Sequence, residues 1–361
     1  MGAVSLNSEA GTGPWVRSLL DIYCYAARPA RRWKAAIQLE LKGDVDQRFA
    51  AVGGALMSGF TERRDVGASV AVVLDGELVV DLWSGYRDRG RSQAWERDTL
   101  VCGFSMTKGV TALCVLQAVA EGLIELDLPV ASIWPEFGNQ GKEKITPRHL
   151  LTHQAGLCGL HEPAEKDLYY DWPAMIMALE REYPWWEPGT RHGYHARTFG
   201  FLLGELLIRA SGRSVGAWLK EHIAQPFCLD FHIGLNQSDL PRCAQILPAR
   251  VRAGDAASGG MMADFNDIST PTGAAFQNPS LGPGYMNSER FRRCEMPAMN
   301  GHGTARSLAR LYGMIEELLP ADLFREATAT HSLGEDLVLK SLTHFGLGFM
   351  LHHQQAPIGV G

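Results

Sequence analysis

Ser105-Met106-Thr107-Lys108 lies at the start of an apolar run from Phe104 to Ala120, and this stretch predicts a buried helix. Side chains three positions apart share a helix face, so we expect the lysine amine beside the serine hydroxyl. Burial lowers the pKa of a lysine, and a neutral amine can take the proton of a serine nucleophile. Because residues 101–104 show no helical pattern, Ser105 is expected at the helix N-terminus, where its N–H can stabilise an oxyanion.

The composition predicts a globular protein. Of the 361 residues, 46% are hydrophobic and 20% are charged, which is enough for a large core. A net charge of -6 without a Lys/Arg block argues against nucleic acid or an anionic membrane surface as a partner. The 7 cysteines form no C-x-x-C pair, and the N-terminus lacks the pattern of a secretory leader. We therefore expect reduced cysteines and a cytoplasmic location.

Residues 67–74 and 77–83 are apolar, β-branched runs joined by Asp75-Gly76, which predicts an antiparallel hairpin. Both faces of this hairpin need cover, and the helix at 104–121 is the expected cover. A further strand is predicted at 345–351. Other helical patterns lie at 147–153, 172–182, 197–211, 214–224 and 304–319.

This order of elements predicts an α+β fold, in which an antiparallel sheet built from both termini is flanked by helices and carries an inserted helical domain. The expected parts are an N-terminal extension (1–43), a sheet domain (44–125 plus 330–361) and a mainly helical domain (126–329). Residues 252–300 lack a clear period and are predicted to be a long active-site loop. Ser105 is expected at the seam between the sheet and the helices, where pockets form.

A second serine competes with Ser105 as a nucleophile. Gly212-Arg213-Ser214-Val215-Gly216 matches the G-x-S-x-G elbow, which works only on a strand-to-helix turn. The preceding residues 199–210 have helical spacing instead. We therefore interpret Gly212 as a helix C-cap and Ser214 as the N-cap of the next helix.

The histidines do not predict a zinc site. His149 and His153 are four apart but lack the glutamate of H-E-x-x-H. His352 and His353 are adjacent on a predicted strand and therefore point to opposite faces. Tyr194 follows a turn and leads into a helix, where a tyrosine more often packs than catalyses. The local sequence leaves the role of Tyr194 open.

Together these motifs resemble those of the serine β-lactamase and penicillin-binding-protein superfamily, in the class C-like branch that includes family VIII carboxylesterases. The resemblance spans roughly residues 44–351. The stretches that carry it are Ser105-Met-Thr-Lys108, Gly122-Leu-Ile-Glu-Leu-Asp-Leu-Pro-Val130, Ile145-Thr-Pro-Arg-His-Leu-Leu-Thr-His-Gln-Ala-Gly-Leu157, Glu187-Pro-Gly-Thr190 with Tyr194, and Asn300-Gly-His-Gly-Thr-Ala-Arg-Ser-Leu-Ala-Arg310.

The resemblance implies a β-lactamase/transpeptidase-like fold and hydrolysis through an acyl-enzyme. By position, Ser105 corresponds to the acylated nucleophile and Lys108 to its proton acceptor. Tyr194 takes the place of the tyrosine that shares the base role and passes a proton to the leaving group. No metal or organic cofactor is implied. The expected partner is a small-molecule ester or amide, and homo-oligomer formation is left open.

One departure from the family pattern concerns the tyrosine motif. In β-lactamases it usually reads Y-x-N, and the asparagine binds the amide of the antibiotic side chain. Here it is Tyr194-His195-Ala196, and alanine cannot make that hydrogen bond. The leading hypothesis is therefore a carboxylesterase-type serine hydrolase acting on small esters. The alternatives are a β-lactamase or D-alanyl-D-alanine peptidase, and a non-catalytic binding or oligomer-forming protein.

A second departure concerns the C-terminal part. The third motif of the family lies downstream of a strand resembling residues 345–351, and the sequence ends at Gly361, where that motif would begin. His344-Phe345-Gly346 matches its H-x-G variant by letters but belongs to the preceding strand. We therefore expect the C-terminal strands and a second oxyanion donor to be missing, and the hairpin to lack sheet neighbours. Impaired activity and self-association would follow.

Overall fold

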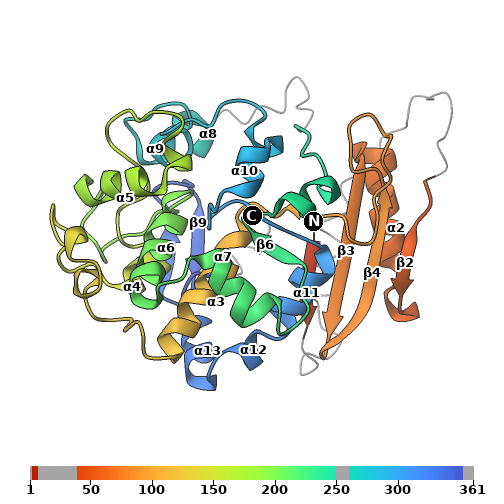
Figure 1. Cartoon of the computed structure of the whole chain (residues 1–361), viewed down its shortest axis with the longest axis horizontal. Helices are drawn as coiled ribbons and strands as arrows, with labels where there is room; N and C mark the ends of the chain where they lie inside the picture. Colours follow the sequence, from red (N-terminus) through yellow and green to blue (C-terminus); the bar gives the residue numbers. More distant parts are fainter. Residues whose placement is uncertain (1, 7–38, 249–259, 353–361) are drawn as a thin grey trace.

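The computed structural model describes residues 2–6, 39–248 and 260–352, with a sheet at one end and a larger, mainly helical body at the other (Figure 1). The strands of the main sheet follow the order β1 (Gly2–Leu6), β3 (Gly67–Leu74), β4 (Glu77–Gly85) and β2 (Lys42–Val45). Strands β3 and β4 form the predicted antiparallel hairpin, and Asp75 and Gly76 have positive φ in its turn.

The hairpin has a neighbour on each side, contrary to expectation. Strand β1 runs parallel to β3, and β2 runs antiparallel to β4. Both neighbours include residues of the predicted N-terminal extension, of which residues 7–38 lie outside the described part. Within the described residues, the outer edge of β3 and the outer edge of β4 therefore each form backbone hydrogen bonds with a neighbouring strand.

Two helices cover the faces of the main sheet, and neither is the predicted one. Alternate residues of a strand face opposite ways. Ala71 and Val73 pack against Ala305 and Ala309 of α11 (Ala305–Gly313). On the other face, the cluster containing Val72 includes residues of α2 (Ala50–Ser58). In Figure 1, α11 lies between the sheet and the helical body.

The predicted helix over 104–121 is α3 (Met106–Ala120), and it lies inside the helical body (Figure 1). Its side chains are buried almost all round, so it cannot serve as a cover with one wet face. It packs chiefly against α6 (Thr198–Ser211) within the largest hydrophobic core. The other helices of this part are α4 (Pro147–Leu151), α5 (Trp172–Arg181) and α7 (Val215–Trp218).

A small sheet brings distant segments to the start of α3. Its order is β5 (Val101–Cys102), β7 (Gly301–Gly303) and β6 (Phe231–Ile233), and all neighbours are antiparallel. The N–H of Gly103 donates to the carbonyl of Gly301 at 2.8 Å. Residues just before β7 are therefore held beside Ser105.

The C-terminal strands form a sheet of their own. Strand β8 (Ser332–Glu335) pairs with β9 (Leu342–Phe345), and within the described residues neither joins the main sheet. The expectation of a main sheet built from both termini is thus not met for residues 332–345. The strand predicted at 345–351 is also misplaced, because β9 ends at Phe345. Residues 353–361 lie outside the described part.

Short helices complete the chain. Residues 260–300 are not a structureless loop, because they contain three of these helices, whereas residues 249–259 lie outside the described part. The short α-helices are α8 (Met261–Asp264), α9 (Pro271–Gln277), α10 (Glu289–Arg293), α12 (Ile315–Leu318) and α13 (Ala321–Ala327). The tighter or wider turns are η1 (Gln47–Phe49), η2 (Gly59–Arg63), η3 (Val130–Ser132), η4 (Pro135–Phe137), η5 (Leu168–Tyr170), η6 (Leu219–Ala224), η7 (Gln237–Arg242) and η8 (Tyr285–Asn287).

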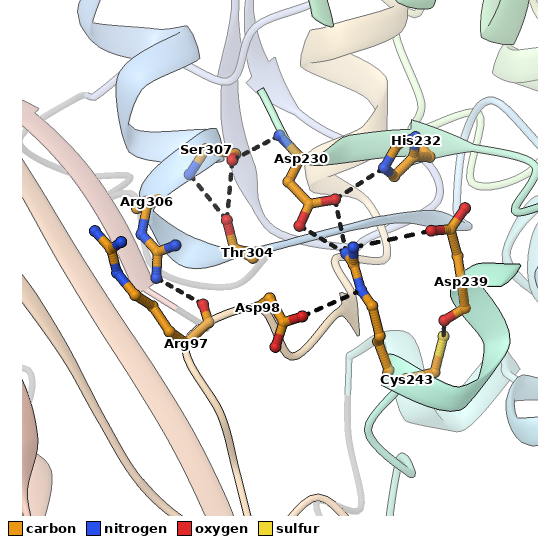
Figure 2. Close-up of polar contacts among 10 residues, drawn as sticks. Arg97, Asp98, Asp230, His232, Asp239, Cys243, Thr304, Arg306 and Ser307 are labelled. Atoms are coloured by element: carbon orange, nitrogen blue, oxygen red, sulfur yellow. Dashed lines mark hydrogen bonds and ion pairs between the residues drawn. The ribbon is translucent and has the colours of Figure 1, made fainter. Parts of the chain in front are cut away.

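A polar network joins the sheet to the body, and Figure 2 shows the part of it around Arg306, Ser307 and Asp230. Arg306 of α11 pairs with the buried Asp81 of β4 at 2.9 Å and donates to the carbonyl of Arg97 at 2.6 Å. Arg242 pairs with Asp230 at 2.6 Å, and the N–H of Asp230 donates to the hydroxyl of Ser307 on α11. In the described part of the chain, no helix is long and apolar enough to cross a membrane.

Candidate active site

Ser105 lies where the chain turns sharply into α3. The preceding Phe104 has a φ of 46°, a left-handed conformation that a residue with a side chain rarely adopts. Ser105 itself is helical and half-buried. Among the described residues its N–H has no hydrogen-bond acceptor, so it is free to donate to a substrate oxygen.

Lys108 is buried, and three oxygens surround its amine. Its Nζ lies 3.3 Å from Oγ of Ser105, 2.7 Å from the carbonyl oxygen of Ala196 and 2.8 Å from that of Ala298. These carbonyls come from the loop before α6 and from the segment before β7. The structure thus brings together the hydroxyl and amine that the helix spacing predicted as neighbours.

The surroundings of Lys108 favour its neutral form. Burial lowers the pKa of its amine well below the usual 10.5, and the nearby charge of Arg197 lowers it further. A neutral amine has two N–H groups and one lone pair. In that form, the carbonyls of Ala196 and Ala298 can take both N–H groups, and the lone pair is then left for the hydroxyl of Ser105. This arrangement suits proton abstraction.

Tyr194 lies beside the same pair of residues. Nζ of Lys108 is 4.6 Å from the centre of its ring. Burial raises the pKa of its phenol to about 12, opposed by a hydrogen bond with Ser105. The phenol is therefore protonated near neutral pH and can donate a proton. The structure brings all three predicted site residues together, and their catalytic roles stay a prediction.

The sequence did not point to Asp336, which fixes the backbone at Tyr194. This carboxylate is fully buried in the loop between β8 and β9. Its Oδ1 accepts from the N–H groups of Tyr194 at 3.1 Å and of Val338 and Leu339 at 2.8 Å. Nothing near it in the sequence resembles the stretches that carry the family resemblance, so only the fold could reveal it.

Apolar side chains surround Tyr194. Half-buried Trp185, Phe276 and Leu337 join it around a buried cluster that includes Trp186. Phe276 lies on α9, within the predicted loop 252–300, and belongs to this cluster. Ala196 belongs to the same cluster and is buried. The position where β-lactamases usually carry an asparagine therefore adds apolar surface and no side-chain donor.

The competing motif has a structural role. Gly212 has a φ of 73° and ends α6, and Ser214 begins α7 by accepting from the N–H of Ala217. The capping interpretation is thereby confirmed. The Ser214 hydroxyl also donates to Glu295 at 2.8 Å.

His149 and His153, which are four apart in the sequence, have separate surroundings in the structure. Nδ1 of His149 accepts from the N–H of Thr146 in a capping box, whereas His153 is buried beside Tyr194. His353 lies outside the described residues. Within the described ranges, no group of three or more His, Cys, Asp or Glu is arranged to hold a metal ion.

Comparisons with known proteins agree on one family. Its model, described as Beta-lactamase, matches residues 46–360 of this chain. The esterase/beta-lactamase LipL of Mycobacterium tuberculosis is 36% identical over 275 residues, which make up 76% of this chain and 64% of LipL. The chain thus spans less than two thirds of that relative. A solved family VIII carboxylesterase is 34% identical with a TM-score of 0.78, over 87% of this chain and 84% of its own. A penicillin-binding protein homologue from Caulobacter crescentus is 35% identical with a TM-score of 0.76, over 86% and 83%.

Proposed function

Because this chain belongs to the beta-lactamase family, we propose that it is a serine hydrolase that cleaves small carboxylic esters through an acyl-enzyme on Ser105. The family membership confirms the predicted resemblance and the α+β fold class. One observation carries the proposal. The amine of Lys108 lies 3.3 Å from Oγ of Ser105, with its two N–H groups matched by the carbonyls of Ala196 and Ala298.

In the proposed acylation, Ser105 Oγ attacks the ester carbonyl while its proton moves to Nζ of Lys108. The oxyanion that forms accepts from the N–H of Ser105. When the ester bond breaks, Tyr194 donates its phenolic proton to the departing alkoxide and regains one from the Lys108 ammonium. The products of this half are an alcohol and an acyl-Ser105, and the neutral amine is restored.

In the proposed deacylation, a water molecule attacks the acyl carbon and passes its proton to the same Lys108 and Tyr194 pair. The bond to Oγ breaks, Ser105 regains its proton, and a carboxylic acid leaves. Both halves use groups that the fold already holds within reach of one another.

An ester with a small apolar acyl group fits the surroundings of the site best. Ala196 and the cluster of Trp185, Trp186, Phe276 and Leu337 offer apolar contact and no side-chain amide beside Tyr194. LipL carries both activities in its name, whereas one structural neighbour is a carboxylesterase. The ester hypothesis is preferred over β-lactam hydrolysis because of Ala196.

Intact mass before and after incubation with a fluorophosphonate tests the nucleophile. The wild-type chain should gain one adduct, Ser105→Ala should gain none, and the matched control Ser214→Ala should label like the wild type. Labelling that survives Ser105→Ala would refute the assignment. Turnover of p-nitrophenyl butyrate against a chromogenic cephalosporin then decides between an esterase and a β-lactamase.

We also propose a cytoplasmic location, supported by free thiols at the six cysteines of the described part, of which Cys228 is exposed. Labelling the protein and measuring its amount in separated cell fractions checks this location. Assembly of several copies stays a prediction, for which light scattering on the purified chain gives the mass in solution.

A further inference from the structure

Two buried histidines join the loop after α4 to the loop before α6. The N–H of Gly193 donates to the carbonyl of His153 at 3.1 Å, and the N–H of His195 donates to its Nδ1 at 3.1 Å. In the opposite direction, the N–H of Leu157 donates to Nε2 of His195 at 3.0 Å. Each loop thus supplies a ring nitrogen that accepts a backbone N–H of the other.

These contacts fix the proton on each ring. Nδ1 of His195 lies 2.7 Å from the carbonyl of Gly193, which can only accept, so this nitrogen carries the hydrogen and Nε2 is the acceptor. Nδ1 of His153 faces an N–H, so its proton is on Nε2. Both rings are therefore neutral. Burial agrees with this, since it lowers the pKa of His195 to about 4 and that of His153 well below 6.5.

The backbone held in this way carries two parts of the proposed site. Between Gly193 and Ala196 stand the side chain of Tyr194 and the carbonyl that accepts from Lys108 at 2.7 Å. Asp336 holds the N–H of Tyr194 from a third direction. A shift of this short loop would move the proton donor and an anchor of the base together.

His153 is also in an unusual backbone conformation. Its φ is 60°, although it is not a glycine, and the residue is 2% exposed. Such a conformation is unfavourable for a residue with a side chain and persists where the surroundings require it. Its ring is packed among Tyr194, Phe199 and Phe345, with ring centres 4.7–5.0 Å apart.

We propose that His153 and His195 form a histidine clamp, a pair of positioning residues whose ring nitrogens hold residues 193–196 so that Tyr194 and the Ala196 carbonyl face Lys108. The clamp rests on the proposed function, because its effect on rate is an effect on the reaction at Ser105. Neither ring exchanges a proton with substrate. Each acts by accepting a backbone hydrogen bond from the other loop.

Four variants test the clamp, because asparagine and glutamine imitate different ring nitrogens. An asparagine oxygen takes the place of Nδ1, and a glutamine oxygen reaches the place of Nε2. At position 153 the bridging acceptor is Nδ1, so His153→Asn should preserve the clamp and His153→Gln should break it. At position 195 the bridging acceptor is Nε2, so His195→Gln should preserve the clamp and His195→Asn should break it.

For p-nitrophenyl butyrate, the expected kcat is higher for Asn than for Gln at position 153, and higher for Gln than for Asn at position 195. The preserving variants should keep kcat within about 3-fold of the wild type, and the breaking variants should lose about 10- to 100-fold with KM nearly unchanged, as for a misplaced catalytic group. Hydrogen exchange of the peptide covering residues 192–198 should speed up in the breaking variants only. The melting temperature of each variant shows that it is folded.

The same order of Asn and Gln at both positions, or four folded variants with equal kcat and equal exchange, would overturn the clamp. A wild-type chain without Ser105-dependent turnover would instead refute the proposed function. The exchange data still decide the clamp in that case, because faster exchange in His153→Gln and His195→Asn alone supports it and uniform exchange contradicts it.

Discussion

At the residue scale, the chemistry depends on the charge of Lys108. Its burial and the nearby charge of Arg197 favour a neutral amine, which an exposed lysine reaches only near pH 10.4. Ser105 gains a base in this way without a histidine or a carboxylate beside it. Burial disfavours the charged form of Lys108, and only the uncharged form can act as the base.

The pH dependence of acylation should show this directly. Below its pKa in the folded protein, Lys108 holds a proton and cannot accept another, so kcat/KM should rise with pH through that value and then level off. Because burial lowers this pKa well below 10.5, the plateau should begin well below pH 10.5. Tyr194, with a pKa of about 12, stays protonated across the plateau. A rate that still climbs tenfold per pH unit near pH 10 would contradict the prediction.

The serine and lysine could be predicted from the sequence because a helix places residues three apart on one face. Tyr194 needed the family resemblance, since no local rule links it to Ser105. The carbonyls of Ala196 and Ala298 left no signal, because every residue has a carbonyl and only the fold decides which ones meet an amine. The contacts of Asp336 and of the two clamp histidines likewise depend on the fold and could not be predicted from the sequence.

At the element scale, the cap of α7 offers a test that separates stability from activity. Ser214→Ala removes the acceptor for the N–H of Ala217 and the partner of Glu295. The free energy of unfolding should fall by about 1–2 kcal/mol, measured by urea titration. Ester turnover at saturating substrate should stay within about 2-fold of the wild type, because the cap does not touch the site. A total loss of turnover in folded Ser214→Ala would restore Ser214 as a candidate nucleophile.

The loop between β8 and β9 should tolerate one change at Asp336 and not another. Asp336→Asn keeps an oxygen for the three backbone N–H groups, whereas Asp336→Ala leaves them buried without an acceptor. We expect Asp336→Ala to lose about 3 kcal/mol or more of stability and Asp336→Asn to lose clearly less. Chemical denaturation of both variants measures this. Equal losses in the two variants would mean that the contacts to Oδ1 contribute little.

The elements were predicted well where a local pattern decides them and poorly where a partner does. The hairpin over 67–85 and the helices near 147, 172, 198 and 305 follow from turn residues and periodicity. The wrong assignment of the sheet cover has a physical cause. Apolarity on all sides marks α3 as central, whereas Ala305 and Ala309 give α11 a narrow face that fits closely onto β3.

At the scale of the whole molecule, the seam between the sheet and the body depends on a buried ion pair. Arg306→Met removes the main partner of Asp81, whose side chain is only 10% exposed, and Arg97 is the remaining cation at 3.5 Å. A loss of about 2–4 kcal/mol is expected. The double variant Arg306→Met with Asp81→Asn should lose less than the sum of the single variants. Strict additivity in thermal unfolding would argue against coupling across the seam.

The overall architecture was predictable as a class but not in its pairings. Strands at both ends of the chain suggested one sheet, yet β8 and β9 pair with each other and β1 pairs with β3. Strand patterns record which residues are apolar and do not record which edge a strand joins. The placement of residues 2–6 beside β3 therefore had no counterpart in the sequence pattern.

The two carbonyls around Lys108 come from positions 88 and 190 residues further along the chain. A partly folded chain that has formed α3 alone carries the serine and the lysine but leaves the amine in water, protonated and inert. Reactivity toward a fluorophosphonate would then report completed assembly of three distant segments rather than the presence of one helix. Titrating a preparation with such a reagent would count its finished molecules, and during refolding the labelled fraction would rise only as the last of these segments arrives.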